Sequence, residues 1–123
     1  RDWSSDVCSS DLIDFYFACN DALAYDLAIA VNDWCVAADA TLDPARARAF
    51  VAGYHSVRAL APAERAAFAG LLRASALRFW MSRLYDKFLP RAGALTRAKD
   101  PRHFQRVLEA RITGAATVGG LFA

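Results

Sequence analysis

The alternation of apolar and polar positions predicts a mainly α-helical chain that begins with one short strand. Residues 12–17 (LIDFYF) form a short, aromatic and largely apolar stretch, which is typical of a buried strand. The next segment, residues 21–39, is apolar on nearly every face, and we expect a long helix buried in a larger body. Because a single strand cannot pair its own edges, the pattern indicates a piece of a larger fold.

Three further helices are marked by prolines at their expected first positions. Asp43 and Asp100 each stand directly before a proline and can cap a helix start with a carboxylate. Pro62 gives a weaker start, because an alanine precedes it and only Glu64 supports it. We expect these helices at residues 44–57, 62–88 and 101–112, which brings the predicted fold to one short strand and about four helices.

The two ends of the chain differ in composition from its middle. Residues 1–12 (RDWSSDVCSSDL) are rich in serine and aspartate and lack the features of a secretory signal. A back-translation of residues 2–12 resembles a common short-read sequencing adapter, so we expect this segment to be an artefact and not native sequence. Residues 113–123 hold two adjacent glycines and no periodic pattern, and we expect an irregular tail. The native domain would then be residues 13–112.

Composition and charge exclude several functional classes. The 123 residues suffice for one small domain with a core, and their net charge is only +2. Most arginines stand singly among apolar residues, which does not predict nucleic-acid binding. No apolar run reaches the roughly eighteen residues that a membrane span requires. Cys19 and Cys35 lack metal-ligand spacing, and such sparse cysteines indicate buried thiols in a reducing cytoplasm.

Asp14 is the first residue that could carry chemistry. It is a carboxylate between Ile13 and Phe15 in the predicted apolar strand. Burying a carboxylate without a partner is costly, so Asp14 requires a cation, a metal ion or a place at the end of the strand. Spacing alone leaves both a metal ligand and a capping residue at the strand end open.

Other polar residues have structural interpretations when taken one by one. Asp21 can cap the first predicted helix, and Asp26 and Asp33 share one of its faces, where they can bond backbone or arginine partners. His55 and His103 are isolated from other catalytic residue types. We expect both histidines at the surface or packed between helices.

Residues 13–34 (IDFYFACNDALAYDLAIAVNDW) together resemble a segment of aminoglycoside phosphotransferases and choline kinases, where an IDxE or IDF motif precedes DPxxDLA. Within that superfamily, the sequence is most similar to the proteobacterial homoserine kinases of the choline-kinase-like fold. Residues 76–91 (ALRFWMSRLYDKFLPR) and 99–112 (KDPRHFQRVLEARI) extend the resemblance across residues 13–112. It implies the C-terminal helical part of a protein-kinase-like fold.

The resemblance also implies an activity and a metal site. Homoserine kinases transfer the γ-phosphoryl group of ATP to the side-chain hydroxyl of homoserine, in threonine biosynthesis. Asp14 stands where the family's magnesium-binding aspartate lies, a role that suits a hard cation and a carboxylate oxygen. Ile13 beside it is implied to contact the ATP cofactor. Asp26, in YDLA, matches a buried aspartate that braces the catalytic loop without taking part in the chemistry.

An acceptor site is implied on the helix predicted at residues 62–88. In choline kinases the corresponding helix carries aromatic residues that hold a cationic head group. This sequence keeps Trp80 and offers Arg83 where an aromatic would stand. A guanidinium suits the carboxylate of an amino-acid substrate, which it can bind through two hydrogen bonds. An equally good alternative is a structural bridge from Arg83 to Asp86 or Asp33.

The sequence departs from the family before the predicted strand. An HGDxxxxN-type catalytic loop should stand there, and residues 1–12 take its place. The phosphate-covering loop and the phosphate-pairing lysine of the N-terminal lobe are also missing, so we expect no catalytic base in this chain and no activity from it alone. A non-enzymatic four-helix interaction module remains the alternative from another class, supported by the lack of a complete motif. Neither interpretation fixes an oligomeric state.

Overall fold

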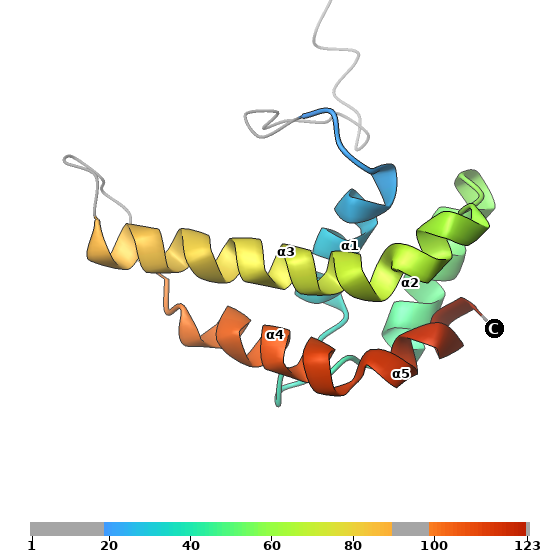
Figure 1. The fold of residues 1–123 in the computed structure, drawn as a ribbon. Helices are drawn as coiled ribbons and strands as arrows, with labels where there is room; N and C mark the ends of the chain where they lie inside the picture. Colours follow the sequence, from blue (N-terminus) through green and yellow to red (C-terminus); the bar gives the residue numbers. More distant parts are fainter. Residues whose placement is uncertain (1–18, 90–98, 123) are drawn as a thin grey trace, which may run out of the picture.

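The computed structural model describes residues 19–89 and 99–122, and these residues form five α-helices and a terminal 3-10 turn. The long helix α3 is central: α1 packs against it, and α4 runs back alongside it (Figure 1). The last elements turn toward α2, so that η1 packs against that helix. The elements are α1 (Leu23–Trp34), α2 (Pro44–Val57), α3 (Pro62–Phe88), α4 (Arg102–Thr113), α5 (Ala115–Gly119) and η1 (Gly120–Phe122).

The mainly helical prediction is confirmed, and the prolines mark the helix starts well. Helices α2 and α3 have the predicted bounds, and α4 begins and ends one residue later than predicted. Asp43 caps α2 as expected, because its Oδ1 accepts the amides of Ala45 and Arg46, each at 3.1 Å. The strand expected at residues 12–17 lies outside the described residues, as do residues 1–12. Within the described part, extended pairing is limited to one isolated bridge between Val36 and Leu42.

The first helix is shorter than predicted, because local hydrogen bonds end it at Trp34. Past this point Asp39 Oδ1 accepts both the amide and the hydroxyl of Thr41, at 3.0 and 2.6 Å. Such side-chain bonds offer the backbone an alternative to the helix. Ala40 between them has a φ of 70°, a left-handed conformation that an alanine adopts only at a cost. The segment expected to continue the helix is therefore a compact turn.

The prediction of an irregular tail was wrong for the described residues of this segment. Helix α5 and η1 bury Val118 and Leu121 against the core, and the ring of Phe122 meets Phe68 edge-on with centroids 5.5 Å apart. Gly114 permits the close turn from α4 to α5, because a Cβ there would lie 2.9 Å from the carbonyl oxygen of Ala110. The burial of Val118 and Leu121 thus stabilises a helix that the glycine-rich sequence of this segment does not predict.

The core has two parts that follow one another along the buried face of α3. The first lies among α1, α2, α3 and the final turns, with Phe68 and Leu72 at its centre. The second lies between α3, α4 and the turn after α1, and contains Ala76, Phe104 and Val107. None of the helices in the described part of the chain is both long and apolar enough to cross a bilayer.

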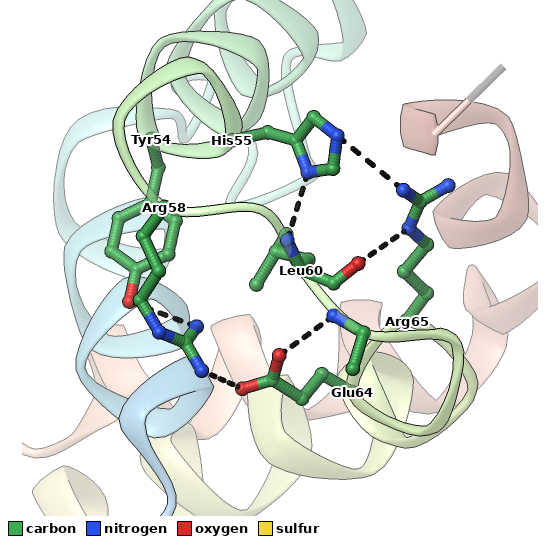
Figure 2. A network of polar contacts seen from close by, with 7 residues as sticks. Tyr54, His55, Arg58, Leu60, Glu64 and Arg65 are labelled. Atoms are coloured by element: carbon green, nitrogen blue, oxygen red, sulfur yellow. Dashed lines mark hydrogen bonds and ion pairs between the residues drawn. The ribbon is translucent and has the colours of Figure 1, made fainter.

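A polar network fixes the sharp turn between α2 and α3 (Figure 2). Glu64 accepts the amide of Ala61 at 2.8 Å and the guanidinium of Arg58 at 2.7 Å. On the other side of the turn, the amide of Leu60 donates to His55 Nδ1 at 2.9 Å. His55 therefore has a structural role in the turn, in agreement with the expectation that it packs between helices.

Candidate functional site

Arg83 lies where α3 packs against α4, and two contacts orient its guanidinium. The guanidinium carbon lies 4.3 Å from the centroid of the Phe104 ring, and NH1 donates a 3.3 Å hydrogen bond to the backbone carbonyl of Asp100. Burial lowers the pKa of Arg83, and the carboxylates of Asp33 and Asp100 act in the opposite direction. Arginine stays protonated in proteins, so this is a fixed, oriented positive charge.

The platform beneath Arg83 is aromatic. The rings of Phe79 and Phe104 are stacked, with centroids 5.2 Å apart and an angle of 23° between their planes. Trp80 packs against the same cluster, together with the buried Ala76. Trp80 and Arg83 are about one helical turn apart on α3, so both lie where this helix packs against α4, as expected from their spacing.

The alternative of a structural bridge from Arg83 is not formed. The ion pairs among the described residues join Arg46 to Asp43, Arg58 to Glu64, and Arg102 to Asp100. Asp33 affects Arg83 only through longer-range electrostatics, and Asp86 makes no ion pair with it. The partners of the guanidinium among the described residues are thus a ring and a carbonyl, and no carboxylate in this part of the chain neutralises it by direct contact.

His103 is the other titratable group beside Arg83. Burial lowers the pKa of His103, and the positive charges of Arg83 and Arg106 lower it further, while Asp33 raises it. Its ring meets that of Phe104 at an angle of 76°, with centroids 5.1 Å apart. Packing between helices, as expected for this histidine, explains both the contact and the preference for the neutral ring.

The residues implied to bind magnesium and ATP lie outside the described part of the chain. Asp14 and Ile13 both fall there, and their roles stay predictions. Asp26, implied to be a buried bracing residue, instead lies exposed in the first turn of α1, and its bracing role is likewise a prediction. Among residues 19–89 and 99–122, no group of three or more histidine, cysteine, aspartate or glutamate residues is arranged to hold a metal ion.

A buried polar cluster that the sequence analysis missed joins three helices. Asn32 Nδ2 donates to Ser75 Oγ at 2.6 Å and to the carbonyl of Leu72 at 2.7 Å. Its Oδ1 accepts Arg111 Nε at 2.8 Å, although Arg111 is only 3% exposed. Burial lowers the pKa of Arg111. The sequence contains one signal of this burial, which is the position of Arg111. It follows Phe104 at the spacing of an apolar helix face.

An open pocket on the outward side of α4 does not coincide with the predicted acceptor site. Its volume is about 380 Å³, and neither Trp80 nor Arg83 lines it. The carboxylate of Asp100 is already bound by Arg102, with NH2 to Oδ2 at 2.9 Å. The pocket is lined by Asp100, Arg102, Gln105, Arg106 and Glu109.

Comparison with known proteins confirms the resemblance found in the sequence. Residues 9–60 match the model of the phosphotransferase enzyme family. Over these residues the chain is similar to this phosphotransferase family. It is 60% identical over 98 residues to a homoserine kinase of Methylobacillus flagellatus, a match that covers 80% of this chain and 31% of the relative.

Two further relatives are also named homoserine kinase. A homoserine kinase of Methylobacillus glycogenes is 54% identical over 101 residues, which cover 82% of this chain and 32% of the relative. A homoserine kinase of Cupriavidus pinatubonensis is 50% identical over 109 residues, which cover 88% and 33%. The chain spans about a third of the length of the curated relatives it matches.

Proposed function

We propose that this chain is part of an ATP-dependent kinase that transfers the γ-phosphoryl group to the side-chain hydroxyl of homoserine, in threonine biosynthesis. The observation that carries the proposal is the 60% identity to a homoserine kinase, which extends over 80% of the chain. The oriented guanidinium of Arg83 supports an acceptor that bears a carboxylate. Cys19 and Cys35 are both free, which agrees with a cytoplasmic enzyme, although only Cys35 is buried as expected and Cys19 is exposed.

Each predicted site residue has a place in this proposal. Asp14 would hold the magnesium ion, which neutralises charge on the ATP phosphates, and Ile13 would lie against the nucleotide. Arg83 would bind the carboxylate of homoserine, and Trp80 would form part of the wall beside it. Asp26 would brace the catalytic loop. These residues bind and orient, which is the main contribution of a protein to phosphoryl transfer.

The 123-residue chain by itself should be inactive in this proposal. Its sequence contains no HGDxxxxN-type motif before Asp14 and no lysine in its first 86 residues to pair with phosphates. Positioning and charge stabilisation depend on groups acting together, so a chain that lacks several of them should transfer almost no phosphoryl groups.

The test is a phosphoryl-transfer assay on the full-length protein with ATP, Mg²⁺ and L-homoserine. We expect homoserine-dependent ATP turnover. In Asp14→Asn this turnover should fall by several orders of magnitude, because asparagine has the size of aspartate but lacks the negative charge that would bind the metal. Asp86→Asn, on the exposed side of α3, is the matched control and should retain turnover. Absence of turnover in the full-length protein would favour the helical interaction module, and normal turnover of Asp14→Asn would overturn the metal assignment.

A further inference from the structure

Helix α3 has a second apolar face besides the one that packs in the core. From Gly70 to Phe88, uncharged apolar residues recur at alternating spacings of four and three positions. All of them are exposed except Leu84, which is half-buried, and the exposed fraction reaches 59% at Met81 and 69% at Phe88. We call these positions the outward stripe of α3: Gly70, Ala74, Leu77, Met81, Leu84 and Phe88.

The outward stripe lies on the side of α3 that faces away from α1 and α4. The side chains that α3 buries against these helices include Phe68, Leu72 and Ala76. With about 3.6 residues per turn, the buried positions and the stripe fall on roughly opposite sides of the helix. Figure 1 shows the C-terminal half of α3 extending beyond α1, with α4 below it. The described residues therefore leave the stripe uncovered.

Gly70 is the member of the stripe that the described residues do not explain. Glycine inside a helix is destabilising relative to alanine, because it loses more conformational freedom on folding. A Cβ at Gly70 would meet no atom within 4 Å, so no described neighbour requires a glycine there. Close approach of another backbone is a common reason for glycine at such a position. Gly70 thus points to a chain segment that packs here.

The spacing specifies which kind of element fits the stripe. Alternating steps of four and three average about 3.5 residues, the repeat by which two helices pack side by side at a shallow angle. Leu77, Met81 and Phe88 can insert into the surface of such a helix. Gly70 and Ala74 leave room for its own side chains or backbone. The partner with this chemistry is another α-helix with an apolar face.

The full-length protein is long enough to provide that helix. The chain corresponds to 31% of the Methylobacillus flagellatus relative and 32% of the Methylobacillus glycogenes relative. About two-thirds of a protein of that length therefore lies outside this chain. Large apolar side chains gathered on one exposed face mark a contact surface, because their burial is favourable.

We propose that, in the full-length protein, the outward stripe of α3 packs against an α-helix from the part of the protein that lies outside this chain, with the closest approach at Gly70. Helix α3 would then be buried on two opposite sides, between the described core and the remaining two-thirds of the protein. This inference goes beyond the proposed function and does not depend on which acceptor the protein uses.

The first experiment compares Gly70→Ala with Gly53→Ala in the full-length protein. Gly53 is an exposed residue within α2, and a Cβ there would also meet nothing within 4 Å. Gly53→Ala should raise the unfolding temperature by about 1 °C or more, because alanine favours the helix. Gly70→Ala should lower it by about 3 °C or more, because the added methyl group would collide with the packed helix. A rise in Gly70→Ala as large as in the control would overturn the inference.

The second experiment measures the reaction of introduced cysteines with a maleimide in the folded full-length protein, with labelled peptides identified by mass spectrometry. Met81→Cys on the stripe should react at least about tenfold more slowly than Ser82→Cys, the next residue, which is exposed and off the stripe. Equal rates would overturn the inference. Protection of Met81→Cys that disappears on dilution would assign the stripe to a second copy of the protein and would also overturn it. Neither experiment uses homoserine or ATP, so failure here is distinct from failure of the proposed function.

Discussion

Arg111 and Asn32 are joined by a hydrogen bond of 2.8 Å from Nε to Oδ1, although 79 residues separate them in the chain. Arg111 also donates from NH1 to the carbonyl of Ala40 at 3.4 Å, while its NH2 is buried without a partner among the described residues. The bond therefore connects α4 to the end of α1 at a point where a positive charge is buried. Loss of one of its few partners should be costly.

Asn32→Leu should destabilise the protein more than Arg111→Met. The first change keeps the branched shape of the side chain but leaves the buried guanidinium without its main acceptor, which should cost about 3 kcal/mol. The second removes the charge together with its unpartnered nitrogen, and leaves only two neutral oxygens, Asn32 Oδ1 and the Ala40 carbonyl, without this donor, at about 1–2 kcal/mol. Urea unfolding of the full-length variants measures both. The exposed Arg73→Met is the control, and a larger loss in Arg111→Met than in Asn32→Leu would contradict the prediction.

The start of α3 offers a stabilising substitution. Ala61 occupies the N-cap with backbone angles of −65° and 154°, and Glu64 already bonds its amide, but alanine has no acceptor for the reciprocal bond. Ala61→Ser should complete the capping box and raise the free energy of unfolding by about 0.5–2 kcal/mol. Thermal unfolding checks this. Ala67→Ser, at an exposed position inside the same helix, should be neutral or slightly destabilising, and equal effects of the two serines would exclude capping as the cause.

Local signals explain the parts of the fold that the sequence predicted correctly. Pro44 and Pro62 fix helix starts because their backbone angle and missing amide suit the first helical position, and both predicted helices have the observed bounds. The prediction for α1 extended past Trp34, because it followed the apolar pattern and ignored the hydrogen bonds that Asp39 makes with Thr41.

Non-local contacts account for what the sequence did not predict. Helix α5 depends on the burial of Val118 against segments distant in sequence, and a short glycine-rich stretch gives no local sign of that. The pairing of Arg111 with Asn32 likewise requires the packing of α1, α3 and α4 to be known. In the candidate site, spacing correctly grouped Trp80 with Arg83, but only the structure shows Phe104 beneath the guanidinium.

The contact between Asp100 and Arg102 should make stability depend on pH in the acid range. Arg102 donates to both carboxylate oxygens, and this lowers the pKa of Asp100 from 3.8 to about 2. Because the pKa is lower in the folded chain, the contact stabilises the protein above the unfolded value of 3.8 and this contribution disappears as the pH falls toward 2.

Asp100→Asn should therefore lower the unfolding midpoint slightly at pH 7, by an amount that shrinks as the pH falls below about 4. The effect should be small, because the pair is exposed to solvent. Thermal unfolding of both proteins across this pH range measures it. The same substitution in an Arg102→Met background should have a smaller effect, because only the backbone amide of residue 102 then bonds the carboxylate. A pH-independent difference between wild type and Asp100→Asn would contradict the assignment.

Arg83→Lys should separate acceptor binding from nucleotide binding. Lysine keeps the positive charge but loses the planar fork that stacks on Phe104 and can bond both oxygens of a carboxylate. In the full-length enzyme the KM for homoserine should rise about tenfold or more, while the KM for ATP stays nearly unchanged. Steady-state kinetics with each substrate varied in turn measure the split. Arg73→Lys, on the same helix, should alter neither constant, because within residues 19–89 and 99–122 Arg73 is bonded only to the Ala69 carbonyl. Equal changes in both constants for Arg83→Lys would place Arg83 in the support of the fold and remove it from the acceptor site.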